Sequence, residues 1–170
     1  MLETIASLST RIRHYERELE QLAQQHYPET KLLRQVQGVG TLTALTFVLT
    51  LEEPGRFEES RQVGAYLGLV PGKEQSGERD PQKRISREGD EMLRRLLVGS
   101  AHYILGPFGE DCDLRRHGLK IAGSTAANNA RKRAVVAVAR KLSVLLHHLW
   151  ISGELYEALY NARQPKDRAA

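Results

Sequence analysis

The amino-acid sequence predicts an all-α domain, and three observations support this prediction. Apolar residues recur every three or four positions over long stretches. No stretch of strand length alternates between apolar and polar residues, and glycine and proline residues separate the helical stretches. The 170 residues are 41% hydrophobic and 27% charged, which is ordinary for a globular domain and excludes a chain that is disordered throughout.

Several other classes of protein are disfavoured. No apolar run approaches the ~18 to 20 residues that span a bilayer, and the N-terminus lacks the apolar core of a signal peptide. We therefore expect a cytoplasmic protein without a membrane partner. Cys112 is the single cysteine, so an internal disulfide is excluded, and the six histidines lack ligand spacing. No metal site is predicted.

The first element is a helix that is predicted to end at Pro28. Its apolar residues follow the spacing of a heptad seam, at Ile5, Leu8, Ile12, Tyr15, Leu19 and Leu22. About three heptads make a marginal coiled coil, so this stripe must contact either the body of the domain or a second copy of the chain. Residues 1–28 are predicted to form a coiled-coil arm and, through it, a homo-oligomer; docking on the chain's own domain is the alternative.

The segment between Leu32 and Leu49 has the outline of a helix-hairpin-helix. A short apolar helix, a turn at Gly38-Val39-Gly40 and a second apolar helix opening on Thr41 follow one another. Two glycines allow positive φ and a close approach of the backbone, and the free N–H groups of the second helix point outward. The amides of Gly38, Gly40 and Thr41 are therefore candidate ligands of a DNA phosphate. Simple packing of the two helices is the alternative.

The remaining elements follow from periodicity and breakers. A short helix is predicted over 57–67, then a polar loop or extended hairpin over 68–89, and a helix from the N-cap Asp90 to Gly106. A polar stretch at 108–123 leads into the longest helix, from Thr125 to Gly153, before one last short turn. Residues 29–160 are predicted to form one helical domain, and 161–170 a frayed tail.

The polar loop carries a candidate nucleophile. Ser76 lies among cationic residues, which include the candidate phosphate ligands Arg79, Arg84 and Arg87. A serine hydroxyl attacks phosphorus only when its proton is removed or the attack is stabilised, and guanidinium groups match phosphate oxygens in a bidentate way. Ser86 lies in a similar setting. The alternative for either serine is an ordinary turn residue.

Positive charge is concentrated in one part of the chain. The segment from Asp113 to Leu145 contains eight lysine or arginine residues and one acid, so its net charge is +7. The whole chain carries +4, so the rest of the chain carries about −3. Such a basic helix is typical of a nucleic-acid interface. Arg131, Lys132 and Arg133 are the candidates for DNA attraction. A solvated helix face and a membrane surface are the alternatives.

Four blocks carry a resemblance to a known family. They are GVGTLTA, YLGLVPGKEQSG, KRISREGDEMLRRLLVGSA and RKRAVVAVARKLSVLLHHLWISGELY. In order and spacing they resemble the C-terminal domain of the Piv-invertase-like insertion-sequence transposases, the bridge-RNA-guided recombinases. The likeness extends from the arm to about Tyr156. Glu78, Arg87 and Asp90 depart from the family's usual glycine, lysine and asparagine.

This resemblance implies a mechanism and partners. The family's loop serine falls on Ser76, which would attack a DNA phosphodiester and form a covalent phosphoserine link. It would act with a separate N-terminal domain, whose four acidic residues bind divalent metal such as Mg²⁺, and with a structured guide RNA. The chain starts directly on the arm, so it is expected to be a truncated, engineered or degenerate piece without a cofactor of its own. It is expected to be inactive without the acidic domain.

The sequence therefore predicts a DNA-binding transposase or recombinase domain that uses Ser76 in insertion-sequence transposition. The alternative is a non-catalytic module that binds nucleic acid and forms oligomers.

Overall fold

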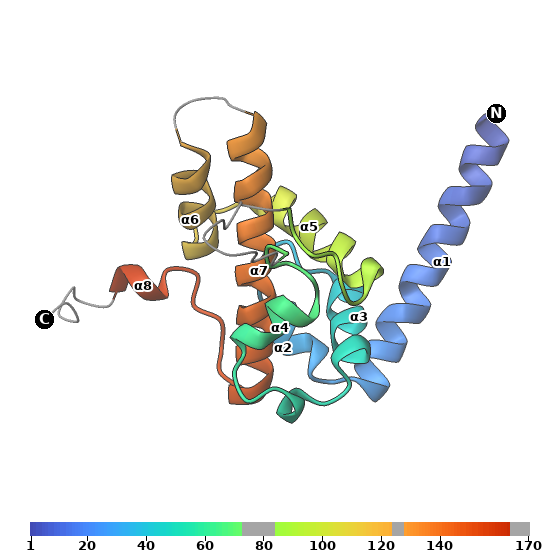
Figure 1. Cartoon of the computed structure of the whole chain (residues 1–170). Helices are drawn as coiled ribbons and strands as arrows, with labels where there is room; N and C mark the ends of the chain where they lie inside the picture. The colour runs from blue at the N-terminus through green and yellow to red at the C-terminus, as the bar shows by residue number, and fades with distance from the viewer. Residues whose placement is uncertain (73–83, 124–127, 164–170) are drawn as a thin grey trace, which may run out of the picture.

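The computed structural model describes residues 1–72, 84–123 and 128–163 (Figure 1). Of the described residues, 69% are helical, and no strand is found among them, so the all-α prediction is confirmed. The helices, with one 3₁₀ turn called η1, are α1 (Leu2–His26), α2 (Thr30–Leu33), α3 (Thr41–Leu51), η1 (Pro54–Arg56), α4 (Arg61–Tyr66), α5 (Glu91–Leu105), α6 (Asp113–Ala122), α7 (Asn128–Ser152) and α8 (Tyr160–Arg163).

Helix α7 is the central element of the body. Val138, Leu142 and Leu146 recur at helical spacing and are fully buried. Helices α4, α5 and α6 all pack against α7, as Figure 1 shows. By length and hydropathy α7 could cross a membrane, but half of its most apolar window is buried inside the fold, as in the core helix of a globular domain.

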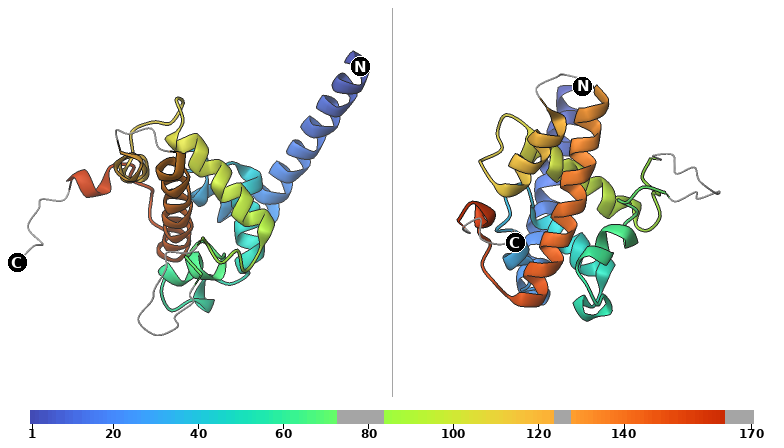
Figure 2. Two further views of the ribbon diagram at one scale, coloured as in Figure 1. Left: turned by 45° about the horizontal axis from the view of Figure 1, so that its top comes forward. Right: turned by 60° about the vertical axis from the view of Figure 1, so that its left-hand side comes forward.

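Helix α1 projects from the body as an arm (Figures 1 and 2). Only its C-terminal end contacts the body, where Ala23 is buried against neighbouring helices. Ile5, Leu8, Ile12 and Tyr15 of the predicted seam are each more than half exposed. The body of the same chain therefore leaves most of the seam uncovered, and a coiled coil stays a prediction.

The glycine turn before α3 is organised by packing rather than by a hairpin of two full helices. Helix α2 has only four residues and ends at Leu33, whereas α3 begins at Thr41 as predicted. Gly38 has a φ of +88°, and a Cβ there would lie 3.2 Å from the carbonyl oxygen of Ser100 in α5. Gly40 is extended, with a φ of −88°. A helix-hairpin-helix is thus not shown.

The polar stretch over 108–123 contains a helix, α6, that was not predicted from the sequence. The sulfur of Cys112 caps this helix by accepting from the Arg115 amide at 3.4 Å. Gly118 is buried, and a Cβ there would lie 2.6 Å from Val138 Cγ2. A side chain at this position would push α6 away from α7. The position of this charged helix therefore depends on close packing against α7.

The polar segment between α4 and α5 begins and ends as an antiparallel ribbon. Pro71 and Ile85 form a β-bridge, the Gly72 amide donates to the Arg84 carbonyl at 3.0 Å, and the Ser86 amide donates to Val70 at 2.9 Å. Residues 68–72 and 84–89 are called the hairpin neck below. The neck carries Arg84 and Arg87 beside the body.

Candidate nucleic-acid interface

A cleft of about 1970 Å³ runs along α7. Its floor is α7, one wall is α6 with the segment at 154–161, and the other wall is the hairpin neck. Figure 2 (right) views α7 with these two walls on either side. Small-molecule pockets measure roughly 300–1,000 Å³, so the size of the cleft favours a polymer over a small ligand.

The floor of the cleft combines charge with apolar surface. Arg133, Ala137, Arg140 and Val144 lie at i, i+4, i+7 and i+11 on α7, and all four line the cleft. The rise of a helix places the two arginines roughly 10 Å apart along the axis. Gly64 of α4 is buried beneath Arg140, and a Cβ there would contact Arg140 Cγ at 3.0 Å. Because Gly64 has no side chain, the aliphatic part of Arg140 can pass over α4 and reach the cleft.

Cationic side chains from two distant parts of the sequence meet in this cleft. Six line it: Arg84, Arg87, Lys132, Arg133, Arg140 and Lys141. Three acids also line it, namely Asp113, Glu154 and Glu157, so its formal charge is 6 − 3 = +3 with neutral histidines. Among the described residues, no carboxylate is paired with any of the six cations. The cleft therefore offers unneutralised cations to an anionic polymer.

His117 lies in the cleft and reflects this positive environment. Burial lowers the pKa of His117 below its usual value, and the charges of Lys141 and Lys120 lower it further. The imidazole therefore stays neutral near pH 7 and leaves its ring nitrogens for hydrogen bonds. His148 of α7, which also lines the cleft, pairs with Glu154 at 3.5 Å.

The hairpin neck is held on the body by one arginine of α5 and by two glycines. Arg94 Nη1 donates to the carbonyls of Leu67 at 3.1 Å and Glu88 at 2.9 Å, which lie at the two ends of the neck. Gly68 and Gly89 have positive φ, and a Cβ at Gly89 would lie 2.1 Å from the Tyr66 carbonyl oxygen. These contacts fix the wall that carries Arg84 and Arg87.

Not every residue of the basic segment faces outward. Arg115 Nη1 donates to the carbonyls of Ile104 at 2.5 Å and Gly106 at 2.7 Å, which satisfies the C-terminal end of α5. Arg116 pairs with Asp111 at 2.6 Å. The local charge of +7 therefore overstates what a ligand meets, because Arg115 bonds the end of α5 and Asp111 offsets the charge of Arg116.

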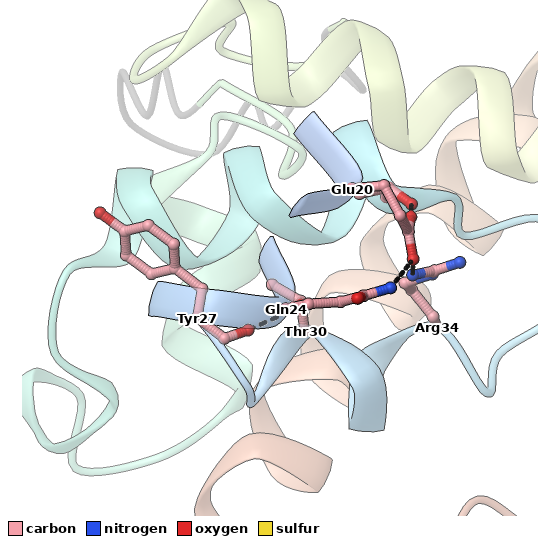
Figure 3. A network of polar contacts seen from close by, with 6 residues as sticks. Glu20, Gln24, Tyr27, Thr30 and Arg34 are labelled. Atoms are coloured by element: carbon pink, nitrogen blue, oxygen red, sulfur yellow. Dashed lines mark hydrogen bonds and ion pairs between the residues drawn. The ribbon is translucent and has the colours of Figure 1, made fainter. Parts of the chain in front are cut away.

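At the start of α3, the side chain of one predicted phosphate ligand, Thr41, is bonded to a carboxylate, whereas binding of a phosphate by the amides of Gly38, Gly40 and Thr41 stays a prediction. The Thr41 hydroxyl donates to Glu20 Oε2 at 2.5 Å. Arg34 donates to Glu20 Oε1 at 2.6 Å (Figure 3). The hydrogen bonds from Thr41 and then from Arg34 lower the pKa of Glu20 to about 2. Glu20 is therefore an anion that ties the arm to the start of α3, and its charge opposes a second anion there.

The other predicted site residues have different positions. Ser76 and Arg79 lie outside the described residues. Arg131 is exposed on α7 but does not line the cleft. The Ser86 hydroxyl accepts a long hydrogen bond from the Glu88 amide at 3.4 Å and thus acts as a turn residue.

The sequence analysis missed part of the cleft. Arg140 and Lys141 were counted in the basic segment but were not singled out, although their spacing from Arg133 was a usable signal. Leu155 and Tyr156 were not recognised as wall residues, because nothing in the sequence places the segment after α7 beside α6. No group of three potential metal ligands occurs among the described residues.

Comparisons with known proteins point to mobile DNA elements. Residues 30–106 match the model of the transposase IS116/IS110/IS902 family. The chain is 32% identical over 142 residues to the transposase for insertion sequence element IS1111A of Coxiella burnetii, covering 84% of this chain and 38% of that protein. It is 32% identical over 138 residues to the transposase for IS1328 of Yersinia enterocolitica, covering 76% of this chain and 41% of that protein. A putative transposase of Sinorhizobium fredii, y4qE, is 42% identical over 69 residues, which is 41% of this chain and 18% of that protein. The chain thus spans about two fifths or less of the length of these relatives.

These matches correct the family assigned from the four sequence blocks. The resemblance to Piv-invertase-like serine recombinases is wrong, because the matched family and the relatives are transposases of the DEDD type rather than serine enzymes. The chain remains similar to transposases of insertion sequences, and no catalytic role is assigned to Ser76.

Proposed function

We propose that this chain is the DNA-binding part of an insertion-sequence transposase and that the cleft along α7 contacts the DNA backbone. One observation carries the proposal: cations of the hairpin neck and of α7 meet in one cleft without carboxylate partners among the described residues. Lysine and arginine contacts to phosphates release counterions and supply affinity that is independent of sequence. The transposase relatives support DNA as the polyanion.

The proposal assigns binding and no chemical step to this chain. In the matched family the acidic residues carry the chemistry, and the described residues hold no group of carboxylates that could bind metal. We place strand cleavage and transfer on the acidic residues of the matched family, with divalent metal held by them. Ser76 has no assigned role here. The interface residues are Arg84, Arg87, Lys132 and Arg133, joined by Arg140 and Lys141.

We also propose that the arm pairs with a second copy of the chain. With Ile5 and Ile12 at heptad position a, Arg11 falls at g and Glu16 at e. In a parallel, in-register pair, Arg11 of one copy faces Glu16 of the other, on both sides of the seam. This complementary charge and the exposed apolar seam favour a second copy as the partner of α1. Because DNA is the proposed partner of the cleft, we also propose a cytoplasmic location.

The binding proposal is tested by the salt dependence of DNA affinity. We expect the observed association constant to fall steeply with salt, and expect Arg133→Ala to weaken binding to all sequences and to reduce the slope of log K against log salt by about 1. Fluorescence anisotropy with labelled DNA of two unrelated sequences measures both quantities.

Arg95→Ala is the matched control for this experiment. Arg95 is exposed on α5, pairs with Glu91 and lies outside the cleft, so this change removes the same charge elsewhere. We expect it to alter affinity much less than Arg133→Ala does. Equal effects of the two substitutions would show that only net charge matters and would refute an interface in the cleft.

A further inference from the structure

The cleft has an apolar interior beneath its cations, which duplex DNA does not need. Ile85 of the neck, Ile121 of α6 and Val144 of α7 are partly exposed in its lining. A duplex presents phosphates and sugars outward and stacks the faces of its bases inside. Duplex backbone would therefore contact the cationic rim and leave the apolar interior without a partner.

An unpaired strand satisfies both parts of the cleft. Its phosphates meet cations, and its exposed base faces gain contact with apolar and aromatic side chains. The segment after α7 supplies such a side chain at the wall, where Leu155 is 77% exposed, while the neighbouring Tyr156 packs against the core. Arg133 and Arg140, roughly 10 Å apart along α7, flank small apolar residues between them.

From this arrangement we infer that the cleft binds an unpaired polynucleotide strand, with its phosphates on the arginines and its bases on the apolar interior. The inference rests on the proposed function and narrows its ligand from DNA in general to unpaired nucleotides. The same chemistry fits DNA and RNA strands, because neither the cations nor the apolar side chains read the 2′-hydroxyl.

The test compares labelled oligonucleotides of equal length as single-stranded DNA, single-stranded RNA and duplex DNA, all at one salt concentration. The matched variants are Leu155→Ser, in the cleft, and Phe108→Ser, which is 78% exposed and outside it. Both changes remove one exposed apolar side chain, so folding is little affected. We expect single strands to bind more tightly than the duplex. We expect Leu155→Ser to weaken single-strand binding about fivefold, since a base contact is worth roughly 1 kcal/mol or more, and Phe108→Ser to leave it unchanged.

The outcomes separate this inference from the proposed function. Tighter binding of the duplex, or equal effects of Leu155→Ser and Phe108→Ser, overturns the inference while DNA binding stands. Absence of binding to every DNA probe overturns the proposed function. If single-stranded RNA alone binds tightly, the cleft still binds an unpaired strand, and the inference is supported. If neither Leu155→Ser nor Arg133→Ala changes the binding of any probe, the inference is overturned. A protein segment would then be the ligand of the cleft.

Discussion

His147 shows how a single polar residue is accommodated in the core. It is fully buried, with Nε2 2.9 Å from the Pro54 carbonyl oxygen and Nδ1 2.9 Å from the Ser60 hydroxyl. Because a carbonyl only accepts, Nε2 carries the proton and donates, and Nδ1 accepts from Ser60. The ring thus links α7 to η1 and to the start of α4. Its neighbour His148 is exposed on the cleft, so adjacent histidines have unrelated roles.

This residue predicts a pH dependence of stability. Burial lowers the pKa of His147, and the hydrogen bond to Pro54 only partly opposes this. The unfolded chain therefore binds a proton near pH 6.5 that the folded chain excludes, and stability is lost as the pH falls from 6.5 towards the folded pKa. The loss is at most about 1.4 kcal/mol per pH unit for one group. Urea unfolding at pH 7 and pH 5.5 measures it.

Two variants isolate the contribution of His147. We expect His147→Gln to lower stability at pH 7 by about 1–3 kcal/mol, because buried partners lose their hydrogen bonds, and to remove most of the pH dependence. A smaller dependence remains from His117, whose pKa is also lowered. His148→Gln should retain the full dependence. If His147→Gln loses as much stability between pH 7 and pH 5.5 as the unaltered protein, His147 is not the source of the pH dependence.

At the scale of elements, the hairpin neck shows how a polar segment without a core of its own is positioned. Its residues bury little apolar surface, so its place depends on the Arg94 hydrogen bonds and on glycines that allow a close approach to α4. The sequence predicted a loop or hairpin here from its composition. Its attachment could not be predicted, because Arg94 and the carbonyls of Leu67 and Glu88 are brought together only by the packing of α4 and α5.

Two glycine substitutions test this attachment. We expect Gly89→Ala to destabilise the protein by several kcal/mol, because the new Cβ would lie 2.1 Å from a backbone oxygen at a φ of +76°. Gly99→Ala in α5 meets nothing within 4 Å and should stabilise by about 0.5–1 kcal/mol through helix propensity. Thermal and urea unfolding measure both changes. A neutral Gly89→Ala would show that the neck can move away from α4 at little cost.

At the scale of the whole molecule, the arm and the cleft divide the protein into two surfaces. The arm projects from the body (Figures 1 and 2), and its seam residues Ile5, Leu8, Ile12 and Tyr15 are exposed. The cleft lies on α7 between its two walls. The Glu20 contacts with Thr41 and Arg34 join the arm to the body. Pairing through the arm would therefore place two clefts in one assembly.

The arm predicts an oligomeric state. We expect sedimentation equilibrium to show two chains at tens of micromolar, and Ile12→Asp to give single chains, because a charge at the seam is not tolerated in a coiled coil. Ile12 is 57% exposed, so the change leaves the body intact. Thr10→Asp, on the outer face of α1, should remain paired. A single chain in the unaltered protein, or dissociation by both variants, would exclude the arm as an interface.

The sequence by itself determined the helical class, the arm, the start of α3, the caps of α5 and the location of the basic residues, because these depend on local periodicity, breakers and charge. Asp90 illustrates this: it was predicted as an N-cap, and its carboxylate accepts from the Leu93 amide at 2.6 Å. Phosphate binding at the glycine turn stays a prediction, and only tertiary structure could place Ser100 against Gly38 and Glu20 against Thr41. The convergence of Arg84 and Arg87 with Arg133 and Arg140 likewise depended on the fold. Contacts between residues about fifty positions apart are decided by how helices pack, and a local pattern holds no information about them.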